Sequence, residues 1–228
     1  MRALATRILT AAAAMAAGLA LAACSGGGGS APASAAGDMT LGQANAPVTV
    51  VEYASVTCGV CAAWNREVYP EFKRRYVDTG RVRYVFREFL TPPEPLAAQG
   101  FMLARCAGSD RYFGVIDALL RGQEEMARTG DTRGTLLRIA QSAGMNEQRF
   151  TTCLRDETAL AAVNARQEAG IAAGITGTPT FLVNGRNIGS GNLPLSQFSA
   201  AINPLLGANA PAAPAAGAFA PSLSLIHI

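Results

Sequence analysis

The chain has 228 residues, half of them hydrophobic, and five cysteines. This length allows one or two domains with a substantial core. The formal charge is +3 and falls by two, to +1, if Arg2 and Arg7 are removed with an N-terminal signal. The chain contains no run of basic residues, which argues against nucleic acid as a partner.

The N-terminus is typical of an export signal. Arg2 and Arg7 precede the apolar stretch 8–21, which is too short to cross a bilayer comfortably. The residues LAAC at 21–24 then resemble the box at which bacterial lipoproteins are cleaved and lipidated. We therefore expect residues 1–23 to form a lipoprotein signal peptide.

Cys24 is the expected lipidation site and would anchor the protein in a membrane. By resemblance to Gram-negative lipoproteins, Ser25 in the next position favours the outer membrane, with the protein on its periplasmic side. The alternative is ordinary signal cleavage at the ALA sequence 20–22, which leaves Cys24 as an unmodified thiol.

Low-complexity segments flank the patterned part of the chain. Residues 24–37 are rich in glycine, serine and alanine and predict a flexible tether. Residues 207–228 are rich in alanine, proline and glycine and predict a disordered tail, in which residues 222–228 continue no domain pattern. The folded domain is therefore expected to span residues 38–206.

The first half of this domain predicts a strand, a helix and a second strand. β-Branched residues indicate a strand at 48–53, and apolar residues at helical spacing indicate a helix from about Cys58 to Gly80. Pro70 lies inside this helix and is expected to kink it. Residues 81–89 alternate in the manner of a strand with one well-buried face. Such a βαβ unit has parallel strands.

The second half of the domain predicts a helical insertion followed by a hairpin. Residues from about 94 to 172 show four groups of apolar residues at helical spacing, which predict a small helical bundle inserted between two halves of the sheet. A strand is expected at 180–183, with a turn at Asn184-Gly185 and an antiparallel return at 186–189. Residues 195–206 predict a closing helix.

Cys58 and Cys61 form a C-x-x-C pair where the first predicted strand meets its helix. Such a pair is ambiguous between redox chemistry and metal binding, but this position favours redox chemistry. Free N–H groups and the dipole at a helix N-terminus stabilise a thiolate. We therefore expect Cys58 to be the nucleophile and Cys61, one turn deeper, to resolve the mixed disulfide. The alternative is a static disulfide.

Glu52 lies on the first predicted strand, six residues before Cys58. Its side chain is expected to point inward beneath the helix. Because burial raises the pKa of a carboxyl group, Glu52 would then be able to accept the proton of the resolving cysteine. The alternative is an exposed glutamate on the sheet.

The region from Leu41 to Leu206 resembles the DsbA-like branch of the thioredoxin superfamily. This resemblance implies the α/β class, with a thioredoxin-like fold and an inserted all-helical domain, and disulfide exchange on exported proteins without a cofactor or a metal. The segments that carry it are VTVVEYASVTCGVC (48–61), RYVFREF (83–89), RCAG (105–108), FTTCL (150–154) and GTPTFLVNG (177–185).

The functional positions of that branch transfer to Cys58, Cys61, Thr178 and Pro179, and more weakly to Glu52. The resemblance implies a cis-proline at Pro179 that lies against the redox pair and presents backbone to the substrate, and an X–Pro bond lowers the cost of the cis form. A trans turn proline is the alternative.

The residues between the two active-site cysteines depart from the family pattern. Strongly oxidising members carry a histidine there, whereas this chain has Gly59 and Val60, and its one histidine is His227. An oxidant is the leading interpretation, and a reductase or isomerase remains the alternative. A less favoured interpretation is a copper(I)-binding protein that uses both thiolates as soft ligands.

Cys106 and Cys153 remain. In an exported protein two further cysteines favour a structural disulfide, and relatives with similar RCAG and FTTCL segments often join them. Two buried free thiols are the alternative. The expected partners are reduced or unfolded exported proteins and a redox partner such as a membrane quinone-linked oxidase.

Overall fold

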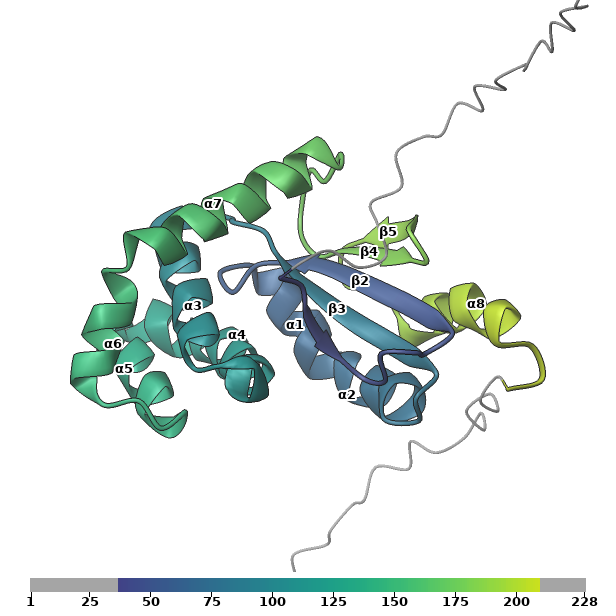
Figure 1. Cartoon of the computed structure of the whole chain (residues 1–228), viewed down its shortest axis with the longest axis horizontal. Coiled ribbons are helices and arrows are strands. Elements are labelled where there is room, and N and C mark those ends of the chain that lie inside the picture. The colour runs from purple at the N-terminus through teal and green to yellow at the C-terminus, as the bar shows by residue number, and fades with distance from the viewer. Residues whose placement is uncertain (1–36, 210–228) are drawn as a thin grey trace, which may run out of the picture.

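The computed structural model describes residues 37–209 (Figure 1). The predicted signal peptide, Cys24, nearly all of the tether and residues 210–228 of the tail lie outside these residues. No helix within 37–209 is long and apolar enough to cross a membrane.

A five-stranded mixed sheet in the order β1-β3-β2-β4-β5 forms the centre of the molecule. Strands β2 (Val48–Ala54) and β3 (Val82–Glu88) pair in parallel, as the βαβ pattern predicts. Strand β4 (Thr180–Val183) pairs antiparallel with β2, and β5 (Arg186–Ser190) returns antiparallel beside β4. The three-residue edge strand β1 (Met39–Leu41) was not predicted, because it is too short to show a period.

The segment after β2 is divided rather than merely kinked. Helix α1 (Gly59–Glu67) ends before Pro70, α2 (Tyr69–Phe72) begins with Pro70 in its first turn, and a π-helical turn follows at Lys73–Val77. Because proline has no N–H and its ring crowds the preceding turn, a new helix starting at this point avoids both problems.

Five helices lie between β3 and β4, where the apolar pattern predicted four. They gather at one end of the sheet, and the last runs back toward β4 (Figure 1). The helix that the pattern missed is α6, which has only eight residues and buries only two of them. The five are α3 (Glu94–Cys106), α4 (Ser109–Thr129), α5 (Thr132–Ser142), α6 (Glu147–Leu154) and α7 (Glu157–Ala172).

The two faces of the sheet bury different sets of side chains. On one face an aromatic cluster packs beneath α1 and α8 (Leu195–Leu206), with the Trp64 ring centroid 4.7 Å from Phe181 and 5.6 Å from Phe198. On the other face α7 approaches so closely that a Cβ added at Gly170 would lie 2.9 Å from the Phe89 ring. Alternation along β2 therefore directs every second side chain toward α1.

A buried ionic network joins the helical insertion to the sheet. The carboxylate of Glu88, at the end of β3, pairs with Arg105 of α3 at 2.6 Å and with Arg166 of α7. The Tyr112 hydroxyl of α4 donates to the same carboxylate at 2.9 Å. Three helices of the insertion are thus tied to one strand end.

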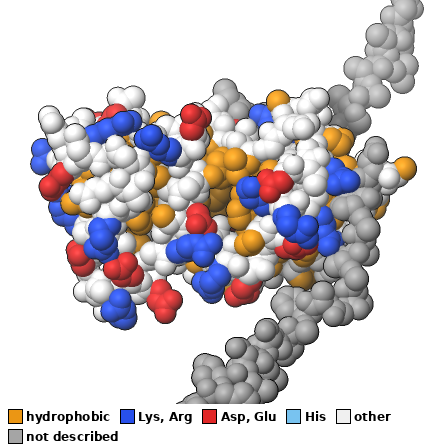
Figure 2. Space-filling model, turned by 90° about the horizontal axis from the view of Figure 1, so that it is seen from below, with side chains coloured by type: hydrophobic (Ala, Val, Ile, Leu, Met, Phe, Trp, Pro, Cys, Tyr) orange, Lys and Arg blue, Asp and Glu red, His pale blue; other side chains and the backbone are white. Residues whose placement is uncertain are grey.

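On the face shown in Figure 2, charges of both signs are interspersed and apolar side chains gather near the middle.

Candidate active site

Cys58 is the N-cap residue of α1, as the strand–helix junction predicts. Its backbone is extended where the loop after β2 enters α1, and its Sγ accepts a hydrogen bond from the Cys61 N–H at 3.2 Å. Both cysteines are free thiols; Cys58 is partly exposed and Cys61 is fully buried. A molecule outside the protein can therefore reach the thiol of Cys58 but not that of Cys61.

The Thr178-Pro179 loop lies directly against Cys58. The peptide bond between these two residues is cis, and the Cys58 thiol donates to the Thr178 carbonyl oxygen with an Sγ–O distance of 3.4 Å. The Thr180 hydroxyl secures the loop by donating to the Gly177 carbonyl at 2.7 Å. The structure thus brings together residues that are 120 positions apart.

The two thiols differ strongly in acidity. Hydrogen bonds from the side chains of Cys61 and Thr178 and from the N–H groups of Cys61 and Val60 lower the pKa of Cys58 from 9.0 to about 6, and partial burial opposes them. Burial, the hydrogen bond to Cys58 and the charge of Glu52 raise the pKa of Cys61. At neutral pH the pair therefore holds a thiolate at the surface and a thiol behind it.

Glu52 is buried on the α1 face of β2, with 3 % of its surface exposed, so the exposed alternative does not hold. Burial raises the pKa of its carboxyl from 4.5 to about 8, a hydrogen bond from Tyr84 opposes this, and the charge of Cys58 adds to it. The Tyr84 hydroxyl donates to Oε2 of Glu52. Glu52 can therefore gain or lose a proton near neutral pH, and its charge acts on Cys61.

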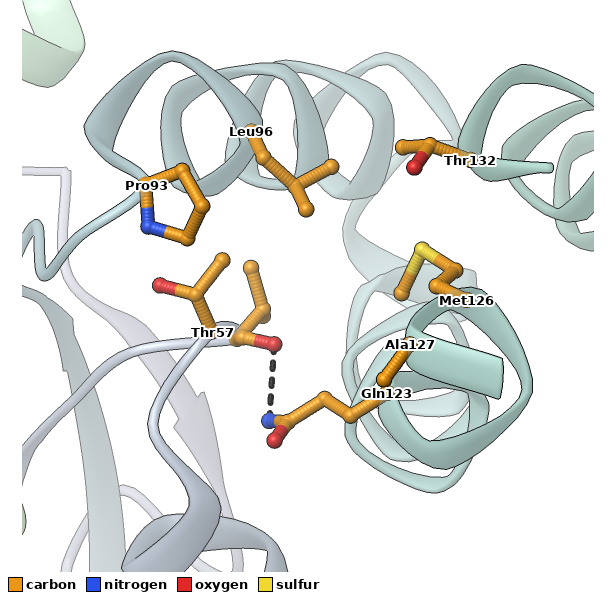
Figure 3. Close-up of a pocket in the computed structure, with 8 residues that line it drawn as sticks. Thr57, Pro93, Leu96, Gln123, Met126, Ala127 and Thr132 are labelled. Atoms are coloured by element: carbon orange, nitrogen blue, oxygen red, sulfur yellow. Dashed lines mark hydrogen bonds between the residues drawn. The ribbon is translucent and has the colours of Figure 1, made fainter. Parts of the chain in front are cut away.

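Gln123 of α4 holds the loop that carries Cys58, and sequence reasoning missed it. Its Nε2 donates to the carbonyl oxygens of Val56, at 2.8 Å, and Cys58, at 3.2 Å; the first bond is drawn in Figure 3. Beside it an open groove of about 320 Å³ runs between α3 and α4 (Figure 3). The groove is lined by Val56, Thr57, Pro93, Leu96, Gln123, Met126, Ala127 and Thr132.

A family model described as Thioredoxin matches residues 34–204. The chain belongs to the thioredoxin family. The crystal structure of Wolbachia pipientis α-DsbA1 has a TM-score of 0.70 and 27% identity, covering 77% of this chain and 94% of that one. This likeness confirms the DsbA-like resemblance and the thioredoxin-like fold with inserted helices. Oxidised BdbD from Bacillus subtilis, with a TM-score of 0.66 and 24% identity over 74% of this chain and 92% of its own, shares the fold.

Curated relatives in Rickettsia carry a name that states an activity. A protein of Rickettsia bellii (strain RML369-C) named "Putative protein-disulfide oxidoreductase" is 35% identical over 171 residues, which are 73% of this chain and 63% of the relative. This thioredoxin-family chain thus spans less than two thirds of the length of that protein.

Cys106 and Cys153 are bonded to each other, with their Cα atoms 6.2 Å apart. The disulfide joins the end of α3 to α6, and Arg149 of α6 donates to the Cys106 carbonyl at 2.6 Å beside it. Within the described thioredoxin-family domain, this bond belongs to the helical insertion and the C-x-x-C pair to the β2–α1 junction.

Proposed function

We propose that this protein is a thiol–disulfide oxidoreductase that acts on exported proteins, principally as an oxidant. The observation that supports it most strongly is the geometry of Cys58. A partly exposed thiol of lowered pKa sits at a helix N-terminus, against the cis Thr178-Pro179 bond, with the buried thiol of Cys61 one turn behind. Such a pair is suited to reversible disulfide exchange.

The oxidative cycle begins with a disulfide between Cys58 and Cys61. A substrate thiolate attacks the Sγ of Cys58, and Cys61 leaves as a thiolate that takes a proton from the protonated carboxyl of Glu52. A second substrate thiolate then attacks the substrate sulfur of the mixed disulfide and releases Cys58 as a thiolate. Two electrons pass from the substrate dithiol to the enzyme, and the low pKa of Cys58 makes it a good leaving group.

Thr178 and Pro179 support the cycle by ordering the substrate. With the Thr178 carbonyl already 3.4 Å from the sulfur of Cys58, backbone of this loop lies beside the atom that is attacked. A substrate segment in extended form would pair with it in the manner of strand addition.

The direction of exchange follows from the stability of the Cys58 thiolate. A stabilised thiolate favours the reduced enzyme and so makes the disulfide an oxidant. The pKa of about 6 lies above the ~3.5 of the strongest oxidants, so we expect a moderate one, with a potential between about −270 and −120 mV. Equilibration in glutathione buffers measures it, and a value more negative than about −270 mV would favour the reductase alternative.

Trapping of substrates tests the assignment of the two cysteines. Cys61→Ala should accumulate mixed disulfides with exported proteins through Cys58, because no thiol remains to resolve them. Cys58→Ala, the matched control, should accumulate none, since Cys61 is buried. Mixed disulfides formed through Cys61 would contradict the proposed roles.

We further infer that Cys24 carries a lipid anchor and that the domain faces the periplasm, as the LAAC box and Ser25 indicate. The mass of the mature N-terminal peptide decides this, and an unmodified peptide that begins at Ala23 would refute it.

The proposed redox partner is a quinone-linked membrane oxidase. Membranes that fail to reoxidise the reduced protein when quinone is supplied would argue against it.

A further inference from the structure

The carboxyl group of Glu52 has few polar neighbours. Within residues 37–209 it forms no ion pair with an arginine or lysine, and its hydrogen-bond partner is the hydroxyl of Tyr84. The titratable groups that face it are Tyr84 from β3, Tyr69 from α2, and Cys58 and Cys61 from the start of α1. From β4 the residue paired with Glu52 is an apolar phenylalanine.

The position of Tyr84 follows from the register of two parallel strands. Tyr84 pairs with Val50, two residues before Glu52, so both side chains lie on the α1 face. Tyr84 is 2 % exposed, and its ring packs 5.4 Å from that of Tyr69. Its hydroxyl is therefore held at one oxygen of a carboxyl that water does not reach.

We propose that Tyr84 is a positioning residue of the redox centre, whose hydroxyl fixes the Glu52 carboxyl so that this group exchanges the proton of Cys61. The donor occupies Oε2 and leaves Oε1 as the atom that gains and loses the proton. In the resolving direction the proton moves from the sulfur of Cys61 to Oε1, and the Cys61 thiolate attacks Cys58 and displaces the substrate thiolate. The inference rests on the proposed exchange function.

The hydroxyl also controls the pH at which Glu52 acts as a base. A hydrogen bond donated to a carboxylate stabilises its charged form, and the bond from Tyr84 lowers the pKa of Glu52 against the effect of burial. Removing the hydroxyl leaves burial unopposed, so the carboxyl should hold its proton to higher pH.

Tyr84→Phe tests the proposal. Reduced protein is mixed with oxidised glutathione, and the rate at which the Cys58–glutathione disulfide is resolved by Cys61 is followed from about pH 4 to 10, a range that spans the ordinary carboxyl and thiol pKa values. The wild type should show a midpoint near pH 8, the pKa of Glu52. Tyr84→Phe should raise it by about one pH unit, equivalent to a roughly tenfold slower resolution at neutral pH.

Tyr112→Phe is the matched control. Tyr112 is also a fully buried tyrosine that donates to a buried glutamate, Glu88, but within the ionic network of the insertion. The Tyr112→Phe variant should be less stable than the wild type, while the pH midpoint of its resolution rate stays unchanged. In a Glu52→Gln background, Tyr84→Phe should have no further effect on the profile, since the titrating group is gone. An unshifted midpoint in Tyr84→Phe, or an equal shift in Tyr112→Phe, would overturn the proposal.

A second measurement covers the case in which Tyr84→Phe does not fold. In this measurement all tyrosines are replaced with 3-fluorotyrosine in a Tyr69→Phe background, so that Tyr84 is the one fluorinated phenol that faces Glu52. Fluorination makes the hydroxyl at position 84 a stronger hydrogen-bond donor, so the pH midpoint of resolution should fall. An unmoved midpoint would also overturn the inference. Failure of the proposed function is distinct, because the wild type would then form no mixed disulfide with glutathione at all.

Discussion

Glu52→Gln should stabilise the reduced protein at neutral pH while it slows disulfide exchange. Burial raises the pKa of Glu52 from 4.5 to about 8, so between these values the fold retains a proton that the unfolded chain releases. The favourable contribution is complete below pH 4.5 and is lost as pH rises through about 8. Each pH unit in this window corresponds to about 1.36 kcal/mol, which amounts to about 3 kcal/mol at pH 7. A glutamine at position 52 does not titrate, so its contribution to the unfolding free energy does not change with pH.

Urea unfolding of both reduced proteins between about pH 4.5 and 9 measures this effect. The unfolding free energy of the Glu52→Gln variant minus that of the wild type should grow by about 3 kcal/mol from pH 4.5 to pH 7 and level off above pH 8. Glu52→Leu is the matched control, because its absolute stability differs but its pH slope should equal that of Glu52→Gln. A difference that stays flat across the range would mean that Glu52 ionises in the fold as it does in the unfolded chain.

Two further variants probe the disulfide of the helical insertion and the loop that carries Cys58. Replacing both Cys106 and Cys153 with alanine should lower stability by up to about 4 kcal/mol, from the loop the disulfide closes, and leave the Cys58 thiolate titration unchanged; a moved titration would contradict a purely structural role. Gln123→Leu removes two hydrogen bonds from the Cys58 loop and should raise the pH midpoint of the Cys58 thiolate absorbance in the far ultraviolet. Arg128→Ala, at an exposed position near the end of α4, should leave that midpoint unchanged and serves as the control.

The parts of the fold that could be predicted are those coded by local patterns. Strands β2 and β3, the hairpin at Asn184-Gly185 and the closing helix α8 follow from periods and turn residues within a few positions. Cys58 could be placed at a helix N-cap for the same reason, because a C-x-x-C pair after a β-branched run marks the junction itself. The family resemblance supplied Thr178 and Pro179, which lie just before another strand.

Residues whose role depends on packing could not be predicted. The apolar pattern of 81–89 placed Tyr84 on a buried face, but only the register with β2 brings its hydroxyl to Glu52. Gln123 looks like any polar residue on a long helix until α4 is packed beside α1. Helix α6 was missed for a related reason, since two buried positions in eight residues show no period; its N-cap Asn146 was the signal available.

The two buried glutamates of the sheet, Glu52 and Glu88, are suited to different roles because their neighbours differ. Glu88 ends β3 and is surrounded by Arg105, Arg166 and Tyr112, so its negative charge is matched and its position is set by three helices. Glu52 sits on the neighbouring strand with one hydrogen-bonding tyrosine and, among residues 37–209, no ion pair, so burial dominates its charge state and the proton becomes exchangeable near neutral pH. Because a nearby positive charge favours the ionised form of a carboxyl group, a cation placed beside Glu52 would convert a proton acceptor into a structural anchor. We therefore regard the absence of an ion pair at Glu52 in the described structure as part of what suits this site to proton exchange.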